Sequence, residues 1–231
     1  MNSSEYWLSI DLSSRIGTLA LLSKDPSGLV KSVFSNKFTE SGDHSETFIP
    51  KLEFLLNQHQ MRVKDISRYI TCSGPGSFTG LRIALATLKA LAYPYQTPID
   101  TVSGSEVRGL SWISKNPLIH SNSIYVVTLI TADKFVLGEF KKGSTSSFQF
   151  LGDKTLNDWS FLKNAPPSTL ILDEKTNPNL IPQHPHISVA NEPLHAETLG
   201  RFLPLSQSRT SYSSIEEWVQ ISPEYFGTSK F

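Results

Sequence analysis

A glycine-rich turn between two apolar segments most narrowly limits how this chain can fold. It follows an apolar segment at residues 65–71 and precedes an almost wholly apolar one at 81–92, and it reads Gly74-Pro75-Gly76-Ser77-Phe78-Thr79-Gly80. Three glycines and a proline allow a sharp backbone turn with unusual dihedral angles. Thr79 is placed to cap a helix that begins there. The sequence therefore predicts a strand, a rigid turn and a buried helix in succession.

Two interpretations of this turn stay open on the residues alone. It can be a structural turn that packs the helix onto a sheet, or its backbone N–H groups can bind an anion at the start of the helix. It does not match a P-loop, because Thr79 stands where the second glycine is required and no lysine follows Gly80. It does not match a nucleophile elbow around Ser77 either, because residue 75 is proline.

Hydrophobic patterning divides the chain into two α/β halves with a boundary near residue 100. Residues 6–38 predict three strands in an antiparallel meander, and residues 45–59 predict an amphipathic helix. A second meander is expected over 124–151, after a helix at 105–113. A short helix at 156–162, a strand at 169–172, an irregular Pro- and Asn-rich connection at 176–193 and a helix at 196–203 follow. Alternating helices and strands favour mixed sheets covered by helices.

Composition excludes several classes of protein. Lys plus Arg and Asp plus Glu both number 21, so the net charge is zero. This argues against a chain that binds nucleic acid alone through bulk charge, though not against one that does so within a complex. No apolar run reaches the roughly 18 residues of a membrane span, and the first residues lack the pattern of a signal peptide. We therefore expect a cytoplasmic protein without membrane contact.

No catalytic or metal-binding constellation is predicted. The chain has 6 histidines, and no two of them are four residues apart, so no HxxxH metal pair exists. His44 is expected to cap a helix or to be solvated. Asp11, at the end of the first strand, is either a catalytic or metal-orienting group or a capping or hydrogen-bonding side chain. Cys72, the single cysteine, excludes an internal disulfide and a cysteine-based zinc site, and no neighbouring histidine activates it.

Several segments resemble the TsaB (YeaZ) family of bacterial tRNA threonylcarbamoyladenosine biosynthesis proteins. The glycine-rich turn with Leu81-Arg82-Ile83 is similar to the family signature almost letter for letter. The resemblance is strong over residues 6–105 and faint beyond. The other matching segments are Tyr6-Trp7-Leu8-Ser9-Ile10-Asp11, Thr18-Leu19-Ala20-Leu21, His44-Ser45-Glu46 with Phe48, Ile49 and Pro50, Lys89-Ala90-Leu91-Ala92, Val102-Ser103 and Pro223-Glu224-Tyr225.

The resemblance implies an actin/sugar-kinase/Hsp70-like (ASKHA) fold of two similar α/β domains with mixed sheets. We expect a first domain at residues 1–103, which carries partner-binding helices, and a second, diverged domain at 104–231, whose C-terminal helix can pack back on the first. The implied function is that of a non-catalytic scaffold or activator. The complex concerned transfers threonylcarbamoyl to N6 of adenosine 37 in tRNAs that read ANN codons.

Partners and their interface are likewise implied by the resemblance. They are the catalytic subunit TsaD, the ATPase TsaE and a second copy of the chain, with tRNA reached only through the complex. No cofactor is expected on this chain alone, whereas ATP and metal are expected on the partner subunits. The interface is expected on the helices at 45–58 and 79–92, at His44, Phe48, Leu52, Leu55, Thr79, Arg82, Leu85 and Leu88.

The sequence also departs from the family pattern. An Asp-Ala-Arg stretch is replaced near Leu129-Ile130-Thr131, the glycine after Ile83 is Ala84, and a basic residue after Tyr225 is Phe226. Contacts of the second domain are therefore not transferred. Two other hypotheses remain. One is a stand-alone nucleotide-dependent kinase or metallopeptidase-like enzyme of the same fold, which the missing HxxxH pair disfavours. The other is a homodimeric interaction module without an enzyme partner.

Overall fold

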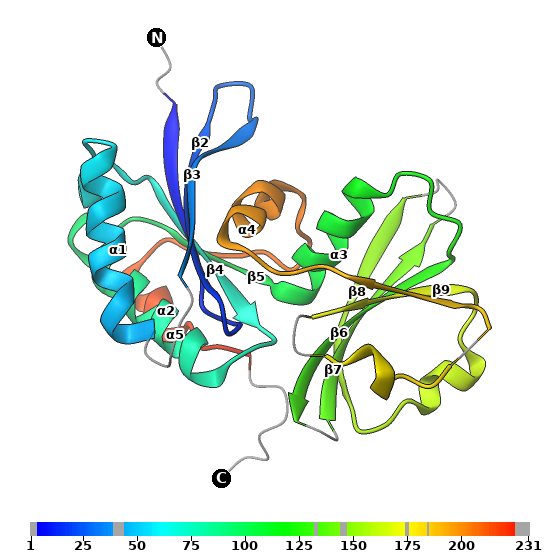
Figure 1. Cartoon of the computed structure of the whole chain (residues 1–231). Coiled ribbons are helices and arrows are strands. Elements are labelled where there is room, and N and C mark those ends of the chain that lie inside the picture. The colour runs from blue at the N-terminus through cyan, green and yellow to red at the C-terminus, as the bar shows by residue number, and fades with distance from the viewer. Residues whose placement is uncertain are drawn as a thin grey trace.

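Two β-sheets with a helix wedged between them form the framework of the molecule (Figure 1). The computed structural model describes residues 4–38, 44–131, 134–143, 147–173, 176–183 and 185–224, with the backbone alone described at residues 38, 44–47 and 180. None of the described helices combines the length and the hydrophobicity of a membrane span.

The first sheet has six strands in the order β11-β5-β4-β1-β2-β3. Its antiparallel meander is continued by two parallel strands and closed by a short antiparallel edge strand. The strands are β1 (Glu5–Asp11), β2 (Gly17–Lys24), β3 (Val30–Phe38), β4 (Arg68–Gly74), β5 (Ile99–Ser103) and β11 (Thr210–Tyr212).

The second sheet repeats this plan with five strands in the order β10-β9-β6-β7-β8. A meander again continues into two parallel strands, so the order matches β5-β4-β1-β2-β3 strand for strand. The strands are β6 (Ser123–Thr131), β7 (Lys134–Lys142), β8 (Phe148–Leu156), β9 (Ser168–Leu172) and β10 (Ile187–Asn191). The predicted fold of two similar α/β halves with mixed sheets is confirmed.

Helices cover both faces of the first sheet because its strands are apolar on both sides. Leu8 and Ile10 of β1 pack on α1 (His44–Gln58), α2 (Phe78–Ala92) and α5 (Ile215–Gln220). Trp7 points to the other face, where α4 (Ala196–Phe202) packs. Short 3₁₀ helices at Val63–Asp65, Tyr93–Tyr95, Ser160–Asn164, Pro178–Leu180 and Leu203–Leu205 join the main elements.

Helix α3 (Gly104–Lys115) lies between the two sheets. A Cβ added at Gly104 would lie 2.9 Å from Sγ of Cys72 in the first sheet, and one at Gly109 would lie 2.2 Å from the ring of Phe140 in the second. The two glycines therefore let the helix approach both sheets closely. Through Val107 it joins the core of the first half, and through Leu110 it packs on the core of the second.

The chain returns to the first sheet from Leu194 onward. Arg209 pairs with the buried Asp100 of β5 at 3.1 Å, and Arg68 pairs with the same carboxylate. The buried Glu106 carboxylate accepts hydrogen bonds from the backbone N–H groups of residues 207 and 208, at 2.6 and 2.9 Å. The division into two domains at residue 103 stays a prediction, but these contacts join the end of the chain to the first sheet.

Three local expectations were wrong in the second half. Strand β8 runs to Leu156 instead of ending at Leu151, and a 3₁₀ turn at Ser160–Asn164 replaces the helix expected at 156–162. The Pro-rich stretch contains a regular strand, β10. Within β8, Gly152 has a φ of +111°, a conformation that other residues rarely adopt. The pairing register between β8 and β7 shifts beside it.

Candidate functional site: the signature loop and the outer face of the first helices

The glycine-rich turn at residues 74–80, called the signature loop from here on, joins β4 to α2. It packs tightly on the turn that follows β1. The Ser77 N–H donates to the carbonyl of Ser13 at 2.6 Å. A Cβ added at Gly76 would lie 2.5 Å from Cβ of Ser13, and one at Gly80 would lie 1.8 Å from the carbonyl oxygen of Leu12. No other residue fits at these two positions without backbone movement, so the glycines serve the close approach of two loops.

Ser77, and not Thr79, caps helix α2. The helix begins at Phe78, and the Ser77 hydroxyl accepts a hydrogen bond from the Gly80 N–H at 3.2 Å. Thr79 lies exposed in the first turn. The N–H groups of Ser77 and Gly80 are thus engaged within the chain, which favours the structural interpretation of the turn over the anion-binding one.

A seam between the two halves runs past this loop. It encloses a cavity of about 10 Å³, lined by Ser13, Ser14, Pro75, Gly76, Arg108, Thr128, Leu129 and Asp173. Asp11 is buried beside it and accepts a hydrogen bond from the Ser13 N–H at 2.9 Å, which is the hydrogen-bonding role considered for it. The cavity holds about one water molecule and does not admit a nucleotide in this arrangement.

No metal-binding cluster is seen in the part of the chain that the structure describes: no three His, Cys, Asp or Glu side chains converge there. His184 lies outside the described residues, as do Tyr225 and Phe226.

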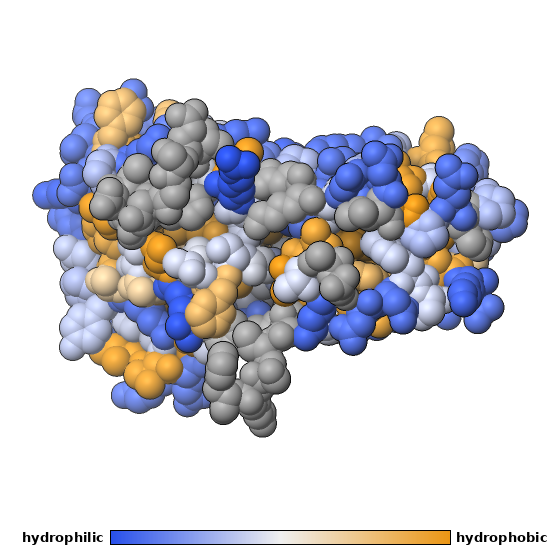
Figure 2. All heavy atoms as spheres, turned by 60° about the horizontal axis from the view of Figure 1, so that its bottom comes forward, coloured by the Kyte–Doolittle hydropathy of each residue, from blue (hydrophilic) through white to orange (hydrophobic). Residues whose placement is uncertain are grey.

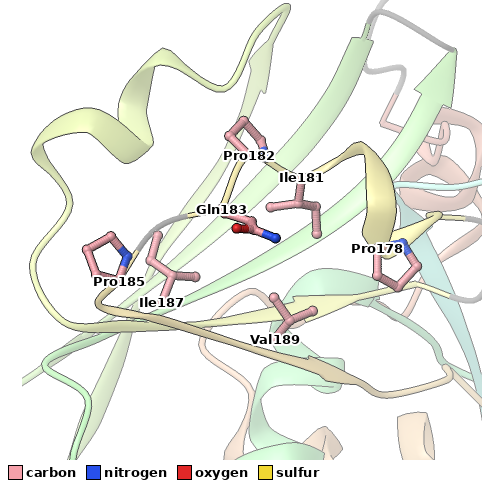
Figure 3. A pocket seen from close by; sticks show the side chains of 7 residues that line it. All are labelled: Pro178, Ile181, Pro182, Gln183, Pro185, Ile187 and Val189. Atoms are coloured by element: carbon pink, nitrogen blue, oxygen red, sulfur yellow. The ribbon is translucent and has the colours of Figure 1, made fainter.

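The surface of the second half has a hollow of about 570 Å³ between the Pro-rich segment at 178–185 and β10 (Figure 3). Its lining is apolar except for Gln183, so it offers no group suited to acid–base or nucleophilic chemistry.

Cys72 is buried, and its thiol is expected to react slowly. It is fully enclosed by the core of the first half, and burial, with a smaller contribution from the charge of Asp11, raises the pKa of its thiol to about 12. We expect the native chain at pH 8 to react with an aromatic disulfide reagent at least about 100-fold more slowly than the urea-unfolded chain. The release of the coloured thiolate measures both rates, and comparable rates would contradict the structural role.

The predicted interface residues divide between the core and the surface. Phe48, Leu52, Leu55, Leu85 and Leu88 lie in the core of the first half, and none exposes more than 3% of its surface. These five side chains cannot contact a partner of the folded chain, which corrects the predicted set. The hydrophobic periodicity of the sequence identified the two helices. The helix face that it singled out as the interface, however, is the face that packs on the sheet.

Thr79 and Arg82 do lie exposed on α2. The side chain of His44 is outside those described. The guanidinium of Arg82 stacks 3.9 Å from the centre of the Phe78 ring, which is itself 43% exposed. This is a cation–π contact at the surface of the first turn.

The outer face of the first two helices carries apolar and small residues. On α1 these include Ile49 and Phe54, which are 41% and 56% exposed. On α2, Ala86 and Ala90 are exposed in line with Arg82, and small side chains let another backbone approach closely. Figure 2 shows apolar groups among polar ones over the part of the surface that belongs to the first half, on the left. We call Ile49, Phe54, Phe78, Thr79, Arg82, Ala86 and Ala90 the outer helix face.

The two sheets of matching strand order define the class first: an α/β protein built from two similar halves with mixed sheets. Comparison with known proteins then narrows this class. The family model described as "TsaD: tRNA N6-adenosine threonylcarbamoyltransferase" matches residues 38–131. The tRNA threonylcarbamoyladenosine biosynthesis protein TsaB of Bacillus subtilis (strain 168) is 35% identical over 100 residues, which are 43% of this chain and 41% of that protein. The chain thus aligns with less than half the length of this relative.

Solved structures extend the similarity to the whole fold. YeaZ from Pseudomonas aeruginosa superimposes with a TM-score of 0.70 at 19% identity, covering 96% of this chain and 100% of that one. A protein from the same organism, described as similar to peptidase YEAZ, gives 0.69 at 19% identity, covering 96% of this chain and 99% of that one. The resemblance to TsaB is thus borne out by sequence over part of the chain, and the YeaZ structures show the same fold over nearly all of it.

Proposed function

We propose that this chain is a non-catalytic scaffold subunit of the assembly that places threonylcarbamoyl on N6 of adenosine 37 in tRNAs that read ANN codons. Two matches carry the proposal: residues 38–131, which include α1, the signature loop and α2, match the TsaD family model, and 100 residues of the chain are 35% identical to a TsaB protein. The work of such a subunit is to bind the catalytic subunit TsaD, together with TsaE, in the cytoplasm. ATP and metal belong to those partners.

Three features support a scaffold rather than an enzyme. The seam cavity of about 10 Å³ is too small for a nucleotide. The signature loop uses its amides at Ser77 and Gly80 for its own packing. The sequence has no HxxxH pair with which to hold a catalytic metal. A kinase or metallopeptidase of this fold needs groups that these places do not supply.

The outer helix face is the surface we assign to TsaD. Its exposed aromatic side chains and its arginine suit the centre of a protein interface, where these residue types are enriched. Arg82 is of a residue type that commonly dominates binding energy. A second copy of the chain is the competing occupant of the same face.

Size-exclusion chromatography with light scattering tests this assignment. The chain, the TsaD of the same organism and their mixture are compared at micromolar concentration. We expect the mixture to give a species with the mass of one copy of each. Separate elution of the two proteins at all concentrations would contradict the proposal, and a homodimer that persists unchanged in the mixture would favour the homodimeric module.

A further inference from the structure

One buried cation has no part in the proposed function. Arg108 of α3 is the only basic side chain among the buried residues that the structure describes, and 3% of its surface is exposed. Its Nη1 donates to the hydroxyl of Thr128 at 2.8 Å. Thr128 belongs to β6, so the guanidinium is attached to the second sheet.

The other side of the same guanidinium faces the first half. Arg108 lines the seam cavity opposite Ser13 and Gly76, which belong to the two loops that pack together at the end of β1 and β4. Among the described residues, its Nε has no hydrogen-bond partner, and the buried hydroxyl of Ser13 has none other than the thiol of Cys72. The cavity has room for about one water molecule, which can bridge such groups. The side chain therefore reaches both halves at once.

Carboxylates from both sheets lie near this cation. Asp173, at the end of β9, lines the cavity with it. Burial raises the pKa of Asp153 on β8 and the charge of Glu106 adds to this, while hydrogen bonding to Ser103 and the nearby charge of Arg108 lower it. Burial and the charge of Asp153 in turn raise the pKa of Glu224. The charge of Asp11 on β1 raises the pKa of the Cys72 thiol on β4, and the charge of Arg108 lowers it. Glu106 lies on α3 itself and holds the loop at residues 206–208. One positive charge thus sits where carboxylates from both sheets meet.

We propose that Arg108 is a positioning residue, a built-in counter-ion that holds the two halves of the chain at one angle without a bound ligand. A single guanidinium bridges the sheets by hydrogen bonding on one side and by charge on the other. Burying it is favourable only while carboxylates remain around it, because an unpaired buried charge is costly. The seam therefore stays closed as long as the arginine and the carboxylates are both in place.

Replacing the cation by an apolar side chain of similar length tests the proposal through its dependence on pH. In Arg108→Met we expect the Tm at pH 8 to fall by about 10 °C, because the carboxylates lose their partner. Without the positive charge the pKa of Asp153 rises further, so the folded state takes up a proton as the pH falls. The Tm deficit should therefore shrink to less than half between pH 8 and pH 5.5.

Two controls separate charge from packing. Arg201→Met removes an arginine whose side chain is 57% exposed on α4, and its Tm should follow the wild type at every pH. Arg108→Lys keeps the charge but not the fork of donors, and its Tm deficit should not depend on pH. A deficit of Arg108→Met that is the same at pH 8 and pH 5.5 would overturn the proposal. So would a variant that folds at neither pH.

A distance measurement tests the angle itself. Spin labels at Lys31→Cys on β3 and Thr155→Cys on β8, both exposed positions, report on the separation of the sheets. We expect one narrow distance distribution in the otherwise wild-type chain and a broader one in Arg108→Met at pH 5.5. Distributions of equal width would show that Arg108 does not set the angle.

Discussion

Gly80→Ala is expected to destabilise the folded chain by about 3 kcal/mol or more, since forced overpacking of a close contact costs this much. The added Cβ would lie 1.8 Å from the carbonyl oxygen of Leu12, which is backbone and cannot rotate away. The loop cannot retreat either, because Ser77 is hydrogen-bonded to Ser13 beside it. Thermal unfolding should show a Tm lower by about 10 °C.

Gly143→Ala is the matched control for this substitution. A Cβ at Gly143 would meet nothing closer than 3.5 Å, so its Tm should stay within about 1 °C of the wild type. Equal Tm values for the two alanine variants would show that the loop and the β1 turn separate easily. In that case the signature glycines would need another explanation than packing.

Two substitutions on α2 should have opposite consequences. Leu88 is fully buried, so Leu88→Glu places a carboxylate in the core at a cost of several kcal/mol, a large part of a total stability of about 5–15 kcal/mol. We expect this variant to be unfolded by circular dichroism. Ala86 is exposed two residues earlier, and Ala86→Glu should fold like the wild type while binding TsaD at least about tenfold more weakly.

A control on another surface completes the comparison. Leu118 is 86% exposed after α3, away from the outer helix face, and Leu118→Glu should leave both folding and TsaD binding unchanged. A folded Leu88→Glu would contradict the described orientation of α2. Normal TsaD binding by Ala86→Glu would remove the outer helix face from the interface, even if the complex itself forms.

The sequence was most informative where local pattern and turn chemistry agree. The strand, turn and helix around residues 74–80 were predicted because glycine and proline restrict what can stand there. The cap was assigned to Thr79 instead of Ser77, a shift of two residues that arises because both hydroxyls precede the apolar segment. The strand β10 was missed because the neighbouring prolines concealed the alternation of Ile187-Ser188-Val189.

Which side chains face outward on α2 could not be read from hydropathy. Ala84 and Leu85 are buried whereas Ala86 is exposed, yet the helix is apolar almost all round, so no side stands out as the surface. Five of the eight predicted interface residues were accordingly large apolar ones, and these five lie in the core. Orientation depends on the sheet beneath, which is assembled from strands distant in the sequence.

The role of Arg108 also lay beyond sequence reasoning. An arginine in a short helix is normally at the surface, and nothing in its neighbours indicates burial between two sheets. The available signal was the pair of glycines in the same helix, Gly104 and Gly109, which are unfavourable in a helix unless close packing requires them. Both do meet atoms of a sheet at short distance.

Reconstituted modification tests the central claim most directly. Unmodified tRNA that reads an ANN codon is incubated with TsaD, TsaE and the threonylcarbamoyl-adenylate donor, and the modified nucleoside is quantified with and without this chain. We predict that transfer depends on the wild-type chain, is retained with Leu118→Glu and is lost with Ala86→Glu at equal concentration. Equal transfer in the absence of the chain would contradict its assignment as a scaffold of the reaction.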